Sequence, residues 1–459
     1  MVKKYGTLLA TLVQWINEIQ GYSLLAKLFS LKTPTIEAFA SNLLPGALRL
    51  KNTSLVSALL NVGVNPNLPI GYIKISPLQY TAKSGSNEII RLLLEFGADI
   101  NAPAGRYYGH TALQAASKQG NIELVRLLLD AGADVNAPAG SDYGFTALQA
   151  ALEKRDIELV QLLLDARADV NAPAGSDSGL TALQAASALG DIKLVRLLLD
   201  AGADINAPTA EIVGRTALQA ASEKGNIELV RLLLDAGADV NAPAGSNYGF
   251  TALQAASEKG NIELVRLLFD TGADINAPAA EVNGRTALQA ASERGHIELV
   301  RFLLDNKANI NAPAAEENGR TALQAASEQG NIELVRFLLD NKANVNAPPG
   351  YKGGVTAIQV AAIKGCITVV QLLLNANADI NAAPAGGIGR TALEGAAEHV
   401  RIDTLQLLIN ARVRTIGDGQ SQYLRAVKFA EKEGHFAAAE LLRNHRPWTK
   451  EDRQIFEES

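Results

Sequence analysis

The sequence is short of the side chains on which most catalytic and metal-binding sites depend. Its 459 residues contain one cysteine, Cys366, five histidines and a single methionine, Met1. One cysteine cannot form an internal disulfide, and this favours a protein of a reducing compartment. Aromatic residues make up only 5% of the chain. We therefore expect a hydrophobic core built from leucine, isoleucine, valine and alanine.

An excess of charge of one sign and long apolar runs are lacking as well. The chain has 42 basic and 48 acidic residues, a net charge of −6, so it offers no basic field to nucleic acid or to an anionic membrane. No run reaches the ~18 apolar residues of a membrane helix. We predict neither direct nucleic-acid binding nor membrane association.

The N-terminal stretch needs separate attention because Lys3 and Lys4 precede an apolar segment, as in a secretory signal. Gln14 and Trp15 interrupt that segment, and no cleavage site of small residues follows it. We interpret it as an amphipathic helix. With the scarcity of cysteine, this predicts an intracellular protein of the cytoplasm, the nucleus or both.

What the sequence does contain is a repeat. Variants of one six-residue string begin at Ser76, Thr356 and Thr391, in register with seven identical copies. The string Thr-Ala-Leu-Gln-Ala-Ala itself begins, at steps of 35 residues, at Thr111, Thr146, Thr181, Thr216, Thr251, Thr286 and Thr321. The length alone would suggest about three globular domains. A fixed period of this size instead predicts a solenoid, in which each repeat packs on its neighbours.

One repeat, Thr216–Pro243, shows the expected local structure. Thr216 and Gln219 have the spacing of a capping box, in which each side chain bonds to the backbone of the other residue at a helix start. Gly225 and Gly237 are placed to end two successive helices in the left-handed conformation. Each repeat is therefore predicted to be a first helix, a turn, a second helix and a protruding finger that returns to the next threonine.

Two details of the helices lead to further expectations. Apolar residues from Ile227 to Leu234 cover most of the second helix, which is typical of a helix buried between neighbours. Other residues replace the glycine at several helix ends: Arg155, Arg167, Lys307, Lys342, Asn377 and Val400. A β-branched side chain resists the left-handed conformation, so we expect distortion around Val400.

The repeated pattern resembles the ankyrin repeat: G-x-T-A-L-Q-A-A-x-x-x-G-N-I-E-L-V-x-L-L-L-D-A-G-A-D-V-N-A. The familiar Thr-Pro-Leu-His is replaced by Thr-Ala-Leu-Gln, and two additional residues fall in the finger. The strings NAPAG and TALQAA are similar to ankyrin arrays of filamentous fungi. The resemblance implies an all-α ankyrin-repeat solenoid of about twelve helix-turn-helix units with β-hairpin-like fingers. We expect an N-terminal helical segment over residues 1–40, the array over 41–446 and a C-terminal tail over 447–459, where a capping helix and a short partner motif are both open.

Function is expected where the repeats differ, because positions shared by every repeat are needed for stacking. The variable positions concentrate in the fingers. Their tips carry tyrosine, and the residue before the capping threonine alternates among arginine, phenylalanine and others, residue types enriched in binding hot spots. The partner-binding candidates are Tyr107, Tyr108, Tyr143, Phe145, Arg215, Tyr248, Phe250, Arg285, Arg320, Tyr351 and Arg390. In an alternative interpretation, each finger arginine pairs with a glutamate of its own finger, and Phe145 and Phe250 merely pack between fingers.

Catalytic chemistry finds no support in the sequence. His296, His435 and Cys366 stand where other repeats cap the second helix, and the one aspartate per repeat, such as Asp239, is expected to brace a loop. We predict no catalytic residue, no metal site and no cofactor. The sequence predicts a monomeric, non-catalytic scaffold for protein partners; the resemblance makes it a regulatory adaptor or transcription co-regulator. The alternatives are a recruitment subunit of a separately encoded enzyme, such as a ubiquitin-ligase or signalling adaptor, and a purely structural array.

Overall fold

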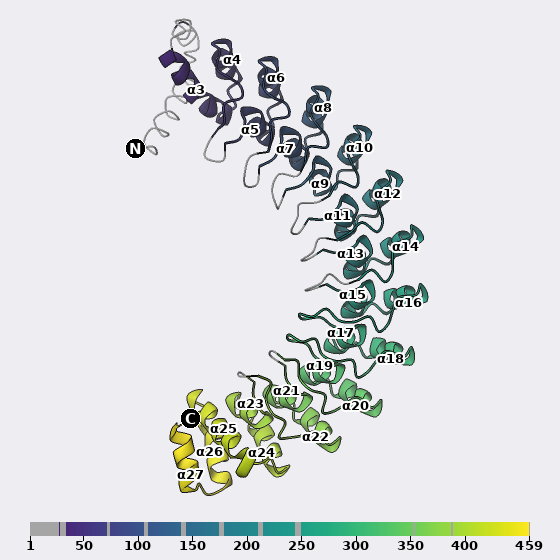
Figure 1. Cartoon of the computed structure of the whole chain (residues 1–459), viewed down its shortest axis with the longest axis vertical. Coiled ribbons are helices and arrows are strands. Elements are labelled where there is room, and N and C mark those ends of the chain that lie inside the picture. The colour runs from purple at the N-terminus through teal and green to yellow at the C-terminus, as the bar shows by residue number, and fades with distance from the viewer. Residues whose placement is uncertain are drawn as a thin grey trace. The chain divides into compact units, whose positions relative to one another are not determined.

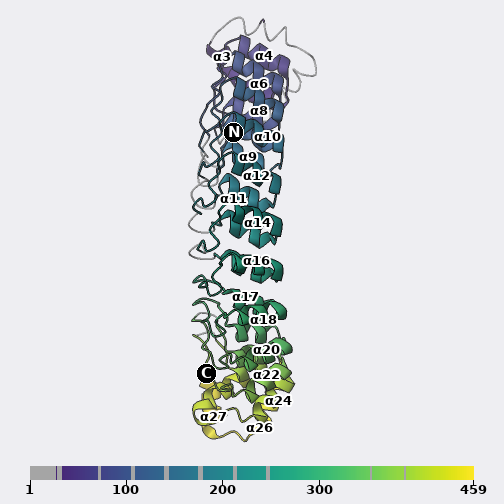
Figure 2. The same ribbon diagram turned by 90° about the vertical axis from the view of Figure 1, so that its right-hand side faces the viewer.

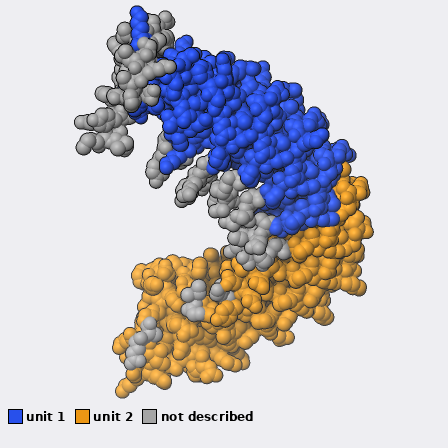
Figure 3. All heavy atoms as spheres, turned by 45° about the horizontal axis from the view of Figure 1, so that its top comes forward, with its two compact units in different colours: residues 1–217 blue, residues 218–459 orange. Residues whose placement is uncertain are grey.

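The computed structural model describes residues 27, 34–70, 74–104, 109–138, 144–173, 179–209, 214–243, 249–351, 354–386 and 389–458. The contacts divide the chain into two compact units, residues 1–217 and residues 218–459, called unit 1 and unit 2 below (Figure 3).

Unit 1 consists of helix pairs. Its described helices are α3 (Pro34–Arg49), α4 (Thr53–Asn61), α5 (Pro77–Ser84), α6 (Asn87–Glu95), α7 (Ala112–Gln119), α8 (Ile122–Asp130), α9 (Ala147–Leu152), α10 (Ile157–Asp165), α11 (Ala182–Leu189) and α12 (Ile192–Asp200). Within the unit, α5, α7, α9 and α11 pack side by side in one row, and α6, α8, α10 and α12 follow one another in a second row (Figure 1). Helix α3 begins inside the segment expected to precede the array.

Unit 2 continues the same pattern. Its helices are α13 (Ala217–Lys224, which starts at the boundary), α14 (Ile227–Asp235), α15 (Ala252–Lys259), α16 (Ile262–Asp270), α17 (Ala287–Glu293), α18 (Ile297–Asp305), α19 (Ala322–Glu328), α20 (Ile332–Asp340), α21 (Ala357–Lys364), α22 (Ile367–Asn375), α23 (Ala392–Glu398), α24 (Ile402–Asn410), α25 (Gln420–Lys432), α26 (Phe436–His445) and α27 (Lys450–Glu458), with a 3-10 turn η1 (Gly417–Gly419). Below, the odd-numbered helices α3 to α25 are the first helices and the even-numbered α4 to α26 the second helices. The described residues thus form twelve such pairs, which confirms the predicted all-α repeat fold.

The fingers lie on the side of the first helices, and within each unit their described parts follow one another along one edge of the stack (Figure 2). The described residues contain no strand, only two isolated bridges. One joins Ile70 to Ile75 within a finger, and the other joins Val282 of one finger to Glu317 of the next. Among the described residues, one finger is thus closed by a single bridge, and one further bridge joins two neighbouring fingers.

The capping boxes form as predicted. In α17, the Thr286 hydroxyl accepts a bond from the Gln289 amide at 3.3 Å, and the Gln289 side-chain oxygen accepts one from the Thr286 amide at 2.9 Å. The same reciprocal pair starts α5, α7, α9, α11, α15, α19, α21 and α23. Because two backbone donors are satisfied locally, each of these nine helices has a defined starting residue and a defined exit for the finger before it.

The hydrophobic core lies between the two rows of helices. In one repeat, Leu218 of α13 and Leu229, Val230 and Leu233 of α14 are at most 1% exposed. The sequence predicted that the apolar residues around most of the second helix are buried between neighbours, and this prediction is wrong for three of the six. Ile227, Leu232 and Leu234 are only half-buried, because no third layer covers the side of the second helix that faces away from the first.

Residues other than glycine do adopt the left-handed conformation at helix ends. After a first helix Gly225 has φ 71°, and Val400 stands at the same place in its repeat with φ 56°. After a second helix Gly237 has φ 90°, and Arg167 and Lys307 stand at the same place with φ 65° and 69°. The expected distortion at Val400 therefore takes the form of an unfavourable backbone conformation for a β-branched residue, while the connection between α23 and α24 is kept.

The C-terminal tail folds as a cap. Helix α27 packs on α25, and Trp448 stacks edge-to-face on Phe456 with ring centroids 5.1 Å apart. The guanidinium of Arg443, on α26, lies 4.7 Å from the Trp448 ring. The last repeat thus exposes less of its apolar side than an uncapped end would.

Candidate functional site

The candidate site is the finger-base position, the residue directly before the capping threonine of each repeat. There the chain leaves a finger and enters a first helix. A partner that contacts both the finger and the helix would therefore also contact this side chain. Phe145, Arg215, Phe250, Arg285, Arg320 and Arg390 occupy this position and are half-buried. Tyr107, Tyr108, Tyr143 and Tyr248 lie outside the described residues and stay predictions.

Arginines at the finger base bond to the first helix that follows them. Arg285 donates to both carboxylate oxygens of Glu293 on α17, with Nη2 to Oε1 at 2.9 Å. Arg390 does the same with Glu398 on α23, with bonds of 2.8 and 3.0 Å. Bidentate hydrogen bonds between a guanidinium and a carboxylate are stronger and better oriented than a single hydrogen bond. They hold the finger base against the last turn of its helix.

The alternative interpretation predicted that each finger arginine pairs with a glutamate of its own finger. In the structure Arg285, Arg320 and Arg390 pair instead with a glutamate of the helix that follows. Arg320 reaches Glu328 of α19 at 3.1 Å, eight residues along the chain. The sequence shows the same spacing wherever arginine stands at the finger base: Arg215 and Glu223, Arg285 and Glu293, Arg320 and Glu328, Arg390 and Glu398. In the three described pairs the guanidinium already has an intramolecular partner, so bracing of the finger accounts for its presence.

Phe145 packs as the alternative interpretation predicted. Its ring lies 4.5 Å, centroid to centroid, from the imidazole of His110, the finger-base residue of the preceding repeat. The ammonium of Lys118 on α7 lies 4.3 Å from the same ring centroid, within the range of a cation–π contact. Phe145 thereby joins two consecutive finger bases and positions both a histidine and a lysine.

Tyr351 is the described candidate that remains open to a partner. Its side chain is 79% exposed, whereas the finger-base candidates are half-buried. An exposed aromatic ring at a finger tip offers a large contact area with little conformational entropy to lose on binding.

The polar side chains that all repeats share are occupied by the fold. Gln254 donates to the carbonyl oxygens of Ala277 and Pro278 at 3.1 and 3.0 Å, which fixes the start of the next finger. Asn241 donates to the carbonyl of Gly272 at 2.9 Å and accepts from the amide of Asp274 at 2.7 Å. The asparagine ladder between repeats was missed from the sequence, although an asparagine at the same register in repeat after repeat signals it.

The residues considered for chemistry have structural surroundings. The Asp274 carboxylate accepts from the amide of Asn276 at 2.8 Å and so braces its loop, as predicted. His296 and Cys366 stand at the starts of α18 and α22 without a side-chain capping bond. Over the ranges the structure describes, no three His, Cys, Asp or Glu side chains gather as a metal ion would require. No helix in those ranges is long and apolar enough to cross a membrane.

Two lysines were missed from the sequence. Lys83 on α5 and Lys118 on α7 occupy the same register, seven residues after the capping residue, and both line a pocket at the His110 finger base. Six of the ten repeats from Ser76 carry glutamate at this register: Glu153, Glu223, Glu258, Glu293, Glu328 and Glu398. A comparison of the repeats position by position would have exposed this change of charge sign.

Comparison with known families gives matches over most of the array. The family model of three tandem ankyrin repeats matches residues 46–139, 137–209, 208–279 and 277–349. The model of a single ankyrin repeat matches residues 353–383. A comparison with curated proteins gives no match.

Proposed function

The chain belongs to the ankyrin-repeat family, and from this premise we propose that it binds one or more proteins through its finger tips and first helices, without catalysis. Ankyrin repeats are generally protein–protein interaction modules. The partner and the surface are the parts of the proposal that need a test, because a fold shared by many proteins does not by itself assign either.

One observation carries the choice of surface. The polar side chains that recur from repeat to repeat make hydrogen bonds within the fold, as Gln254 and Asn241 do. In contrast, the tip of a variable finger presents Tyr351 to solvent. The fingers are attached to capped helices at both ends. The described finger bases are held by bonds such as that of Arg285 to Glu293, so little conformational entropy is lost there when a partner docks.

The proposal is tested by removing the tip aromatics together. Tyr107→Ala, Tyr143→Ala, Tyr248→Ala and Tyr351→Ala are combined in the full-length protein, and partners are captured by proximity labelling. The matched control replaces half-exposed isoleucines of second helices, Ile157→Ala, Ile332→Ala and Ile367→Ala, which are 41 to 43% exposed. We expect specific partners to be lost from the tip variant and kept by the control, with circular dichroism unchanged in both.

Retention of the same partners by the tip variant would contradict the finger surface. A purely structural array predicts no saturable partner for any of the proteins. If the partner kept by the control is an enzyme, the chain is its recruitment subunit; if it is a transcription factor, the chain is a co-regulator. The captured protein thus also decides between these two forms of scaffold.

We also propose that the protein is intracellular and monomeric. Fluorescence microscopy of the tagged full chain is expected to find it in the cytoplasm, the nucleus or both, and a signal confined to the secreted fraction contradicts this. Light scattering is expected to give the mass of one chain, and a stable dimer at micromolar concentration overturns the second proposal.

A further inference from the structure

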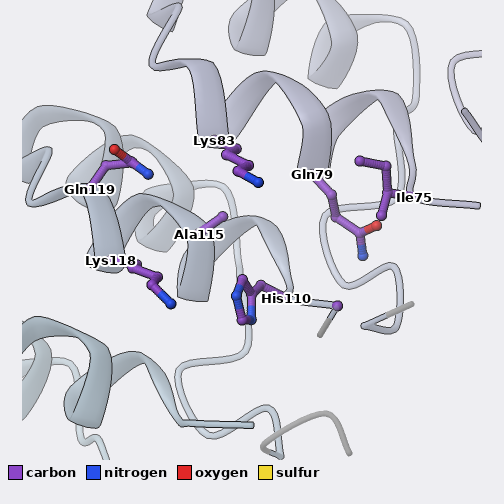
Figure 4. A pocket seen from close by; sticks show the side chains of 8 residues that line it. Ile75, Gln79, Lys83, His110, Ala115, Lys118 and Gln119 are labelled. Atoms are coloured by element: carbon purple, nitrogen blue, oxygen red, sulfur yellow. The ribbon is translucent and has the colours of Figure 1, made fainter. Parts of the chain in front are cut away.

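A small pocket lies between α5 and α7 in unit 1, at the finger base that carries His110. It has a volume of about 150 Å³ and is lined by Gln79, Lys83, His110, Lys118 and Gln119, with Ile75, Gly109 and Ala115 between them. Lys83 and Gln79 extend from α5 toward the side of the pocket where His110 lies, and Lys118 reaches it from α7 (Figure 4). We call it the α5–α7 pocket.

The charges in this pocket are of one sign. Over the residues that the structure describes, neither Lys83 nor Lys118 pairs with a carboxylate, and the Lys118 ammonium contacts only the Phe145 ring, at 4.3 Å. A lysine in the last turn of a helix is favoured by the helix dipole. The dipole of each helix favours one basic residue at that register, and the stacking of α5 on α7 places the two like charges beside one cavity.

The equivalent place in unit 2 shows how the protein otherwise neutralises this register. Between α15 and α17, Glu258 pairs with Arg294 at 2.6 Å, and Glu293 takes both donors of Arg285. Each of these four charged side chains thus forms an ion pair with a side chain of opposite charge in the same chain. At the α5–α7 pocket neither lysine has such a partner among the described residues, so an acidic group of another molecule can pair with them.

His110 adds a polar atom without a partner. Its Nδ1 is buried and makes no hydrogen bond over the described residues. Burial, followed by the charges of Lys118 and Lys83, lowers the pKa of His110, while a backbone hydrogen bond with Gly109 and the charge of Glu153 at the end of α9 oppose this. A buried polar atom left without a hydrogen bond destabilises the folded state, and a group that binds beside it can supply that bond.

We propose that the α5–α7 pocket receives a carboxylate side chain from an acidic segment of the partner protein, held by Lys83 and Lys118. The size agrees, since a cavity of about 150 Å³ holds a group no larger than benzene and is well below the roughly 300–1,000 Å³ of cofactor and drug sites. The amide of Gln119 and the imidazole of His110 supply further polar contacts. This inference rests on the proposed scaffold function and names the chemistry of the partner.

The test uses a fluorescein-labelled peptide of alternating glutamate and glycine, with the matching glutamine peptide as its control. Binding to the full-length protein is followed by fluorescence polarisation at two salt concentrations. The pocket variant is Lys83→Glu with Lys118→Glu. The charge-matched control is Lys224→Glu with Lys259→Glu, exposed lysines of α13 and α15.

We expect the pocket variant to bind the glutamate peptide at least about tenfold more weakly than wild type, because like charges then face each other. The control variant is expected to keep its affinity within about twofold, and added salt to weaken the wild-type interaction. Lys83→Gln with Lys118→Gln is the milder variant if charge reversal disturbs folding. Equal losses in the pocket and control variants, or no binding to wild type at millimolar peptide, overturn the proposal.

A second readout reports on the pocket itself. A bound carboxylate offsets the two lysines, so the glutamate peptide is expected to raise the pKa of His110 in an NMR titration of the imidazole, and the glutamine peptide to leave it unchanged. Inorganic phosphate is titrated separately. If phosphate moves the His110 resonances and the glutamate peptide does not, a free anion and not an acidic segment occupies the pocket, and the proposal fails.

The outcome is separable from that of the proposed function. If the tip variant loses its partners while the pocket variant binds them and the peptide as wild type does, the scaffold function stands and the pocket inference falls. If the glutamate peptide binds through Lys83 and Lys118 but no partner is captured by any variant, the pocket stands as a carboxylate site and the scaffold function falls.

Discussion

At the scale of single residues, stability depends on buried polar side chains that have hydrogen-bond partners for each of their polar atoms. Asp452 of α27 is fully buried. Its carboxylate accepts two bonds from Arg446, at 2.7 and 2.8 Å, one from the amide of Thr449 at 2.7 Å and one from Gln420 at 3.0 Å. The Arg446 guanidinium, ahead of these other donors, holds the pKa of Asp452 well below its usual range. The Asp452 carboxylate thus connects α27 to α25 through Gln420, and to the loop before α27 through Arg446 and Thr449.

Replacing that carboxylate is expected to release the C-terminal cap. Asp452→Asn leaves Arg446 without its counter-charge, and breaking a buried pair costs about 3–5 kcal/mol. Hydrogen exchange of the α27 amides is expected to accelerate by at least about a hundredfold. Glu451→Gln, at an exposed carboxylate of the same helix, is the control and is expected to change the rates little. Equal rates in both variants would show that the pair does not hold the cap.

The pH dependence of the same pair has a defined sign. A carboxyl whose pKa is lowered on folding contributes stability above its unfolded pKa, about 3.9, and loses it as the pH falls toward the folded value. The difference between wild type and Asp452→Asn is therefore expected to be full at pH 6 and to shrink steadily below pH 4. A difference that grows on acidification would contradict the assignment.

At the scale of helices and turns, each pair repeats because both of its ends are specified locally. The first helix starts at a capping box, and the turn to the second helix needs one residue in the left-handed conformation. Gly225 meets this need without strain, whereas Val400 is held at φ 56° between α23 and α24. The packing of the pair overrides the local preference of valine at that single position.

Relieving this strain is expected to stabilise the protein. A left-handed conformation costs an L-residue roughly 1–2 kcal/mol, and valine more than asparagine. Val400→Gly is therefore expected to raise the free energy of unfolding by about 1 kcal/mol, and Asn377→Gly by only a few tenths. Urea denaturation measures both. An unchanged or lowered midpoint for Val400→Gly would show that the valine side chain contributes packing that outweighs the strain.

At the scale of the whole molecule, stability is expected to be a sum of repeats and of contacts between adjacent repeats, because each repeat touches mainly its neighbours. The bonds between repeats recur with the period of the sequence. Asn241 reaches Gly272 of the next repeat, and Asn276 reaches Lys307 in the same way. An interior repeat can therefore be removed if the register of these bonds is kept.

Deletion of residues 286–320, one full period, is expected to leave a cooperative protein. It joins Arg285 to Thr321, so the finger base again precedes a capping box and Glu328 replaces Glu293 as the partner of Arg285. The helix content per residue is expected to stay constant, and the guanidinium m-value to fall by roughly the fraction of surface removed. Deletion of residues 286–303, half a period, is the control, and it is expected to broaden the transition or abolish folding. Equal behaviour of the two deletions would contradict a register-dependent array.

Features that depend on short distances along the chain could be predicted from the amino-acid pattern alone. The capping box of Thr286 and Gln289 spans three residues, and the left-handed turn at Gly225 needs one. The periodic pattern was therefore sufficient for the helix pairs, their termini and the ankyrin-repeat family. It was also sufficient to locate the variable fingers, since positions free of stacking can be recognised within one chain.

Contacts between side chains of different repeats could not be predicted in this way and were found in the folded chain. The tertiary structure showed that the second helices are covered on one side, that Phe145 lies against His110 and Lys118, and that Arg285 is already occupied by Glu293. It also brought together Lys83 and Lys118, which are one period apart in the chain. Such contacts cannot be predicted from a local sequence pattern, because they depend on how one helix pair stacks on the next.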